Sequence, residues 1–303
     1  MNLLQKIESL REQQIASIAL MRDNYRALNS IEHRDFHLGP MKVRAIYNPA
    51  RVISSAAKVD AASIAARPCF LCTQNRLEGQ RSVPFLDGKY DILVNPYPIF
   101  DHHYVIAAHS HVRQKIGRRI TDMWQLASEL EGYTVFYNGP RCGASAPDHM
   151  HFQAVASTEL SLWNALDATS PEHVGQTGNA VMSKANGLPI SVFVIDSTTA
   201  EDAYKLANLL YPTFPIDSNE EWEPRFNMLA TSTEQGVRIA VIPRPRHRPS
   251  FYTYDPTDEK GMTVSPASID AAGVLVLPRR IDFNRLDEKT ILSIYNETCV
   301  MPC

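Results

Sequence analysis

Apolar and polar positions along the chain alternate with a spacing that switches between helix and strand. Residues 1–28 carry apolar side chains three or four positions apart, which predicts one amphipathic helix. "VRAIYNPARVIS" predicts a strand and a turn, and the apolar runs "YDILVNPYPIF" and "HHYVIAAHS" predict neighbouring strands around a Pro-rich corner. "TDMWQLASELEGY" predicts a helix, and "YTVFYNG" and "HMHFQAVAS" predict two more strands. The expected order is strand, strand, helix, strand, loop, strand.

The second half of the chain repeats this pattern more loosely. "ISVFVIDS" predicts a strand, "AEDAYKLANLLY" a helix, and "RFNMLATS" with "GVRIAVIPRP" a hairpin across Thr233–Gly236. "AGVLVLPRR" predicts a strand and "NRLDEKTILSIYNETC" a closing helix, while the polar segment around 169–189 is expected to be a connector. Both halves are β-rich meanders ending in a helix, which suggests a duplicated unit without a strict short repeat. We expect a helical extension at 1–40 and two related lobes at 41–180 and 181–303.

Composition limits the classes of function. The 303 residues are 44% hydrophobic and 21% charged, as in soluble globular proteins, and suit one large domain or two ordinary ones. A net charge of −3, from 30 basic and 33 acidic residues, argues against general nucleic-acid binding. The sequence has no signal-peptide pattern and no apolar run long enough to span a membrane, so we expect a protein of the reducing cytoplasm.

Histidines are concentrated in one part of the chain, since six of the ten lie between His102 and His151. In "GASAPDHMHFQ", residues 143–153, strand periodicity places His149, His151 and Gln153 on one face and the intervening apolar residues on the other. The small residues before them, including Gly143 and Ser145, offer backbone N–H groups suited to phosphate oxygens. The alternative is an edge strand with solvated histidines.

Two further groups of residues have candidate chemistry. Cys69 and Cys72 have the Cys-x-x-Cys spacing of a zinc knuckle, with redox use or simple burial as alternatives. Four-coordinate zinc needs two more ligands, and the nearby candidates are His109, His111 and His149.

The densest positive patch lies in "IPRPRHRPSFY". It suits a second phosphate group or inorganic phosphate, and the alternative is a solvated loop. The patch contains Arg244, Arg246, His247 and Arg248.

The motif "GASAPDHMHFQA" resembles the His-x-His-x-Gln signature of the nucleotidyl-transferring branch of the histidine-triad superfamily. This branch includes galactose-1-phosphate uridylyltransferases, diadenosine tetraphosphate phosphorylases and GDP-galactose phosphorylases. The resemblance implies an α/β fold of the α+β type, with two histidine-triad-like lobes, each a mainly antiparallel sheet flanked by helices. It also implies that His151 attacks the α-phosphorus and becomes nucleotidylated, that Gln153 binds the phosphoryl oxygens, and that Asn138 supports this region. The three residues between Ser145 and His149 are one more than the family pattern has, so the loop is expected to bulge.

The resemblance extends to the metal and substrate contacts. "CFLC" resembles the zinc site of the uridylyltransferases, which implies a structural zinc held by Cys69, Cys72, His111 and His149.

Similarity to the basic segment and the nucleotide-side turn of these enzymes implies further contacts. The expected phosphate contacts are Arg44, Arg51 and Lys58, and the residues expected to border the base or ribose are Asn95 and Tyr97. The alternative for the turn is that Tyr97 and Phe100 pack into the core.

Three functions are consistent with these features. The leading expectation is a nucleotidyltransferase or phosphorylase that takes a nucleoside diphosphate-sugar or dinucleoside polyphosphate and passes the nucleotide from His151 to phosphate or a sugar phosphate. A hydrolase of the same superfamily is the second, although Gln153 cannot relay a proton as a third histidine would. A zinc-stabilised nucleotide-binding module without catalysis is the third. Residues 1–40 match no known motif and are expected to be a docking or homodimer helix.

Overall fold

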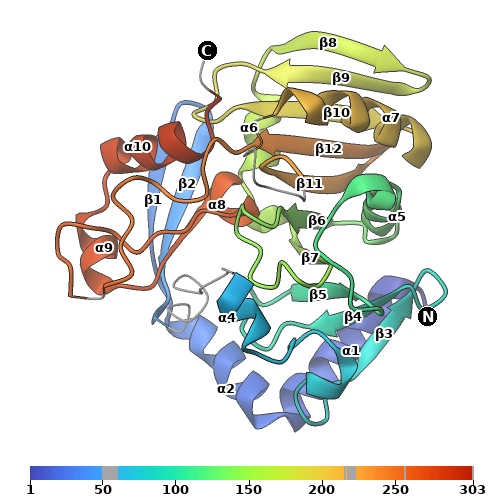
Figure 1. Ribbon diagram of the computed structural model, residues 1–303, viewed down its shortest axis with the longest axis vertical. Coiled ribbons are helices and arrows are strands. Elements are labelled where there is room, and N and C mark those ends of the chain that lie inside the picture. Colours follow the sequence, from blue (N-terminus) through green and yellow to red (C-terminus); the bar gives the residue numbers. More distant parts are fainter. Residues whose placement is uncertain (50–60, 215, 217–222, 256, 302–303) are drawn as a thin grey trace.

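A ten-stranded antiparallel sheet forms the centre of the computed structural model, which describes residues 1–49, 61–214, 216, 223–255 and 257–301 (Figure 1). Its strand order is β3-β4-β5-β7-β6-β11-β12-β10-β9-β8. The first five strands are β3 (Ser82–Phe85), β4 (Tyr90–Val94), β5 (His103–Ala108), β6 (Tyr133–Asn138) and β7 (His151–Ala156). The others are β8 (Pro171–Thr177), β9 (Ala180–Ala185), β10 (Val192–Ser197), β11 (Phe226–Thr233) and β12 (Gly236–Pro243).

The strand order reveals an internal duplication. The first half is arranged 3-4-5-7-6 from its outer edge and the second 8-9-10-12-11, which is the same topology repeated. A helix precedes the last hairpin in each half: α5 (Ile120–Glu129) lies between β5 and β6, and α7 (Ala200–Leu210) between β10 and β11. Pairing of β6 with β11 joins the halves edge to edge. The expected α/β architecture of two related antiparallel units flanked by helices is therefore confirmed.

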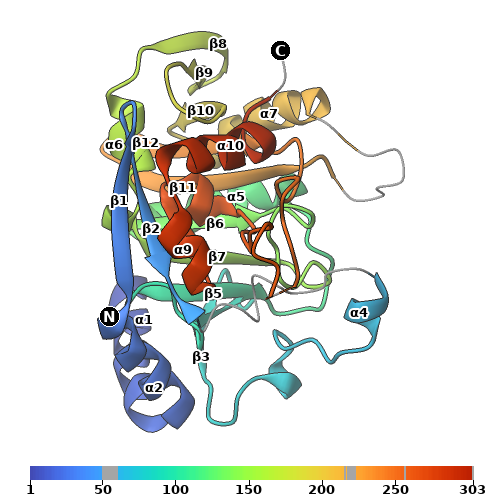
Figure 2. The same cartoon turned by 90° about the vertical axis from the view of Figure 1, so that its left-hand side faces the viewer.

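A smaller sheet lies outside this repeat. The hairpin of β1 (Glu32–Leu38) and β2 (Met41–Tyr47) runs across the stacked strands, and β13 (Val274–Leu277) pairs with β2 in parallel (Figures 1 and 2). A strand from the C-terminal part of the chain, β13, thus pairs with the N-terminal hairpin. Short helices α6 (Leu162–Asp167), α8 (Ser268–Ala271) and α9 (Arg280–Arg285), with α10 (Glu288–Thr298), complete this side of the molecule.

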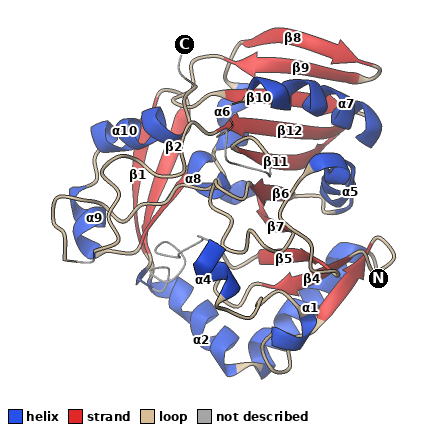
Figure 3. Cartoon of the chain, viewed as in Figure 1, coloured by secondary structure: helices blue, strands red, loops and turns tan. Residues whose placement is uncertain are grey.

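Apolar side chains fill a core on each face of the large sheet. Helices α5 and α7 cover one face with the N-terminal helices, and the small sheet with α6, α8 and α10 covers the other (Figure 3). On β7, Phe152 belongs to the first core and Val155 to the second, as the strand period of two requires. His151 and Gln153 share the face of Val155. None of the described helices is long and apolar enough to cross a membrane.

The single helix predicted for residues 1–28 is wrong, because the structure has two. Helix α1 (Leu3–Ser17) ends where Ile18 adopts an extended conformation, with φ −101° and ψ 112°, and α2 (Ala19–Ala27) and a short 3₁₀ turn, η1 (Leu28–Ser30), follow. One straight helix over these residues would be roughly 40 Å long. The break lets both Ile7 of α1 and Met21 of α2 bury fully in the same core.

The connector predicted for 169–189 is also wrong, because β8 and β9 form a hairpin there. The polar residues that suggested a loop occupy exposed positions of an edge strand, where they need no core contact. Gly178, with φ +55°, provides the tight turn. The short helix α4 (Ala61–Ala65) and the 3₁₀ turns η3 to η6 (Thr73–Asn75, Gly117–Arg119, Ser157–Glu159 and Tyr211–Thr213) complete the described elements.

Candidate functional site

His151 and Asn138 lie at the adjacent ends of β7 and β6. The register pairs Phe136 with Gln153, so that Asn138 falls opposite His151 where the two strands separate. The fully buried Gln114 holds this end together. Its Nε2 donates to the backbone oxygens of Asn138 (2.9 Å) and His151 (3.1 Å), and its Oε1 accepts from the His151 N–H at 2.8 Å.

The imidazole of His151 is held in one tautomer. Its Nδ1 lies 2.8 Å from the backbone oxygen of His149, which can only accept, so Nδ1 carries the proton and Nε2 has the lone pair. Burial lowers the pKa of His151 to about 4, so the ring is neutral near pH 7. Among the described residues no partner faces Nε2, and this atom is not one of the sealed polar atoms without a partner. A neutral nitrogen open to a ligand is what attack on phosphorus requires.

A buried histidine orients the Gln153 side chain. Nδ1 of His103 accepts from the N–H of Ile99 at 3.1 Å, so its Nε2 carries the proton and donates to Gln153 Oε1 at 2.9 Å. The oxygen of Gln153 is therefore occupied, and its amide NH₂ is available on the face shared with His151. His103 was not anticipated from the sequence. Its position at the start of an apolar strand was the available signal.

We expect substitution of His103 to disturb Gln153 rather than His151. His103→Phe keeps a ring in the buried site but removes the proton that fixes the Gln153 oxygen, so the amide can turn over. If Gln153 donates to the phosphoryl oxygens as the resemblance implies, the expected result is a roughly tenfold or greater loss in kcat for nucleotide transfer with little change in nucleotide KM, because such a donor acts on charge that develops during attack. Steady-state kinetics measures this. Unchanged kcat in a folded variant would contradict the assignment.

The loop 139–150 between β6 and β7 packs against the second half of the chain. Gly143 has φ +100°, and a Cβ at this position would overlap that of Ala267. The segment between Ser145 and His149, which is one residue longer than the family pattern, forms a turn. The His149 N–H closes this turn by donating to the Ala146 oxygen at 3.1 Å. Ser145 is exposed, and Arg67 donates to its backbone oxygen at 3.4 Å and pairs with Asp148 at 2.9 Å.

Gly143→Ala is predicted to damage both the loop and the fold. The new methyl group meets Ala267 in a backbone conformation that costs an alanine about 1 kcal/mol before any clash. We expect a loss of unfolding free energy of about 2–4 kcal/mol, measured by denaturant titration, together with weakened nucleotide binding. Ala144→Gly in the same loop is the control for altered flexibility. Wild-type stability in Gly143→Ala would show that the loop moves freely from Ala267.

Four residues form a compact cluster suited to a metal ion. The ligand atoms of Cys69, Cys72, His111 and His149 lie within 4.8 Å of one another. Nδ1 of His149 is 3.2 Å from Cys69 Sγ and 3.6 Å from Cys72 Sγ, and Nδ1 of His111 is 3.2 Å from Cys72 Sγ. Tetrahedral zinc separates such ligand atoms by roughly 3.3–3.8 Å, so the donor set fits.

The hydrogen bonds around the cluster also fit a metal. Nε2 of His149 lies 2.7 Å from the Ala108 oxygen and therefore carries the proton, which leaves Nδ1 directed at the two sulfurs. His109 lies outside the cluster and pairs instead with Asp91 at 3.0 Å. His149 precedes β7 rather than belonging to it, since the strand begins at His151. The expected row of three polar residues on one strand is therefore two residues on the strand and a third in the turn before it.

The other residues expected to bind phosphate are dispersed. Arg44 lies on the outer face of β2, where it pairs with Asp35 (3.3 Å) and Glu159 (3.9 Å), opposite the buried Val43 and Ala45. Arg51 and Lys58 fall outside the described residues.

The arginines of the basic patch in the second half differ in burial and in their partners. Arg246 pairs with Glu297 of α10 at 2.8 Å, and Arg244 is fully buried. Arg248 donates to Ser265 Oγ at 2.9 Å and stacks on Tyr252, with its guanidinium carbon 4.2 Å from the ring centroid. Since Ser265 lies two residues before Ala267, Arg248 is connected to the segment that packs against the Gly143 loop.

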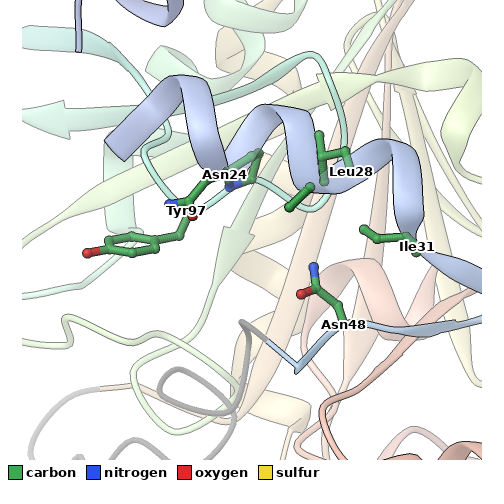
Figure 4. Close-up of a pocket in the computed structure, with 7 residues that line it drawn as sticks. Asn24, Leu28, Ile31, Asn48 and Tyr97 are labelled. Atoms are coloured by element: carbon green, nitrogen blue, oxygen red, sulfur yellow. The ribbon is translucent and has the colours of Figure 1, made fainter. Parts of the chain in front are cut away.

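The Pro-rich corner after β4 serves mainly to position other groups. The Asn95 side chain accepts from the Tyr97 N–H at 2.9 Å. Its Nδ2 packs against the His103 ring, 3.2 Å from Nε2 and 3.5 Å from Nδ1, without a hydrogen bond to the protonated Nε2. Phe100 is buried, as the core alternative expected, but Tyr97 is 47% exposed. Tyr97 borders a cavity of about 30 Å³ beside α2, shown in Figure 4 with Asn48 on its other side. That volume holds about one water molecule.

Comparison with known proteins gives matches over both halves. Residues 10–156 match the family described as a domain of unknown function (DUF4922), and residues 168–301 match the GDPGP1-like C-terminal domain. The structure of yeast Ap4A phosphorylase Apa2 superposes with a TM-score of 0.60 at 16% identity, covering 93% of this chain and 97% of that chain. Its complex with AMP gives 0.58 at 17% (97% and 97%), and its complex with Ap4A gives 0.58 at 15% (100% and 99%). No curated protein sequence matches the chain.

The duplicated antiparallel sheet, with the His-x-His-x-Gln motif near its centre, is the fold of yeast Ap4A phosphorylase Apa2. The match of residues 168–301 to the GDPGP1-like C-terminal domain agrees with this fold, and the expected resemblance is thereby confirmed.

Proposed function

We propose that the protein is a nucleotide phosphorylase or nucleotidyltransferase that works through a nucleotidyl group carried by His151. The observation that carries this proposal is the His151 ring, whose Nδ1 proton is engaged by the His149 oxygen while Nε2 is open to a ligand. The structural similarity to an Ap4A phosphorylase supports the same reaction class. The GDPGP1-like match supports nucleoside diphosphate-sugars as a second class of donor.

The reaction has two displacements at phosphorus. Nε2 of His151 bonds to the α-phosphorus of the donor, and the bond to the leaving phosphoryl oxygen breaks, which releases a nucleoside polyphosphate or a sugar phosphate. A phosphate oxygen of the acceptor then attacks the same phosphorus, and its bond to Nε2 breaks. The free imidazole returns without a net gain of protons, so a neutral histidine suits both steps.

Amide donors stabilise the charge on the phosphoryl oxygens. Gln153 has its oxygen occupied by His103 and presents its NH₂ beside His151. The Gly143 loop contributes backbone N–H groups, with Ser145 at its exposed edge. We assign Arg248 to the phosphate chain or the acceptor, because it is partly exposed and donates to Ser265, two residues before the Ala267 that packs against Gly143. Arg246 and Arg44 are further candidates, and phosphate would compete there with their ion pairs to Glu297 and Asp35.

Zinc is the metal that the Cys₂His₂ set favours, and four protein ligands leave it no open position. Bound there, the ion would be structural. It would tie the Cys69–Cys72 loop and His111 to the turn that carries His149, two residues before the proposed nucleophile. The groups that act on the reacting phosphoryl group are then those of β6, β7 and the loop between them, with Arg248 assigned to the phosphate chain or the acceptor.

The test is a labelling and phosphate experiment with the purified protein. A donor labelled at the α-phosphorus, such as Ap4A or a nucleoside diphosphate-sugar, should give an acid-labile protein adduct. Added phosphate should discharge the adduct as a nucleoside diphosphate in equal amount. Discharge by water at the same rate without phosphate would favour hydrolysis, and nucleotide binding without any adduct or turnover would favour a binding module.

A further inference from the structure

Three polar side chains lie side by side across the join between the two halves. Asn227 of β11 is the register partner of Asn138 of β6, and Asn138 falls opposite His151 of β7. The second half of the chain therefore places the Asn227 amide next to Asn138, which borders His151, the proposed nucleophile. Asn138 and Asn227 are both buried.

Asn227 is oriented by a buried arginine. Arg244 has five N–H donors and no acceptor, and it is fully buried. Its Nη2 donates to the backbone oxygens of Pro266 (2.9 Å) and His247 (3.2 Å), its Nε to that of Thr298, and its Nη1 to Asn227 Oδ1. Because an arginine cannot accept, the group of Asn227 that faces it must be the oxygen.

This orientation determines the next amide. With its oxygen directed at Arg244, Asn227 presents Nδ2 to the Cys142 oxygen (2.8 Å) and to Asn138 Oδ1 (3.2 Å). The backbone N–H of Ser268, at the start of α8, also donates to Asn138 Oδ1 at 2.9 Å. The oxygen of Asn138 is thus surrounded by donors. Its Nδ2 has no acceptor among the described residues and is not one of the sealed polar atoms without a partner, so it is open to a ligand.

We propose that Arg244 and Asn227 are positioning residues that turn the NH₂ of Asn138 toward the reacting phosphoryl group. This inference rests on the proposed function. Arg244, which can only donate, fixes the orientation of the Asn227 amide. Asn227 then helps to fix the orientation of Asn138, whose NH₂ donates to a phosphoryl oxygen beside His151. The second half of the chain thereby takes part in catalysis. Arg244, expected from the sequence to bind phosphate, acts here through two asparagines instead.

The test uses Asn227→Asp, which keeps the shape of the side chain. A carboxylate still accepts from Arg244 but cannot donate to Asn138. Asn138 Oδ1 therefore loses one of its donors and faces a carboxylate oxygen that repels it, which favours turning the Asn138 NH₂ toward residue 227. We expect kcat for transfer to phosphate to fall about 10- to 100-fold, with nucleotide KM changed less than about threefold. Arg238→Gln removes an arginine paired with Asp196 near the other end of the same hairpin, and controls for a general loss of stability.

A double-mutant cycle separates positioning from a structural role. If Asn227 acts through Asn138, then Asn227→Asp should add less than about twofold to the loss caused by Asn138→Ala. Multiplied losses in the double variant, or wild-type kcat in Asn227→Asp, would overturn the proposal. Arg244→Gln, whose amide can accept as well as donate, should resemble Asn227→Asp, whereas Arg244→Lys should retain more activity.

Failure of the proposed function is distinguishable from failure of this inference. A wild-type protein that forms no adduct and turns over no nucleotide would contradict the proposed function. The positioning role is then tested by side-chain amide NMR of ¹⁵N-asparagine-labelled protein. Asn138 NH₂ protons should lie away from the Ser268 N–H in the wild type and approach it in Asn227→Asp. An Asn138 amide with the same contacts in both proteins would overturn the positioning role.

Discussion

His151→Ala should abolish both the protein-bound nucleotide and turnover, with kcat reduced by roughly 10⁴-fold or more, because it removes the atom that would bond to phosphorus. Stability should also fall, by about 1–3 kcal/mol, because the buried ring donates from Nδ1 to the His149 oxygen and that acceptor would lose its partner. The measurement is acid-labile label per chain together with steady-state phosphorolysis. His109→Ala removes an exposed neighbouring histidine as the matched control. Label that persists in His151→Ala would place the covalent step elsewhere.

Loss of the metal cluster is the second large expected effect. Purified protein should contain about one zinc per chain, and Cys69→Ser should lose most of it. The melting temperature should fall by about 5 °C or more and nucleotide transfer should weaken, because the turn before His151 would lose its tie to the Cys loop. Elemental analysis and thermal unfolding measure this, and Cys299→Ser, in the other core, is the control. Unchanged zinc in Cys69→Ser would exclude the proposed ligand set.

The sequence was sufficient for the elements with strong periodicity and for the clustered chemistry. The order of strands and helices from Tyr90 to Ala156 follows from local patterns, and so does the hairpin across Thr233–Gly236. The four members of the metal cluster were expected from the resemblance to the uridylyltransferases, since the Cys-x-x-Cys spacing alone left His109, His111 and His149 open as further ligands. His151 and Gln153 share a face because strand periodicity fixes it.

The residues that the sequence did not identify act through long-range pairing. Gln114 and Asn227 are polar residues that no local pattern marks as buried, and His103 had only its position at the start of an apolar strand as a signal. Their partners lie 24 to 89 residues away and are brought together by the sheet. For the same reason Arg244 was expected to bind phosphate with its neighbours, since its buried position depends on segments around Pro266 and Thr298. The break between α1 and α2 at Ile18 has no local signal either, because it depends on how far the sheet extends.

The duplicated topology has a consequence for stoichiometry. In the first half, β6 and β7 are joined by the long loop that carries Gly143 and Ser145, whereas in the second half the corresponding strands are joined by only Glu234 and Gln235. A two-residue turn has no room to surround a phosphoryl group, so the second repeat lacks the counterpart of that loop. Under the proposed function, only the first repeat carries the reacting group. A fully reacted chain should therefore carry one nucleotidyl group rather than two.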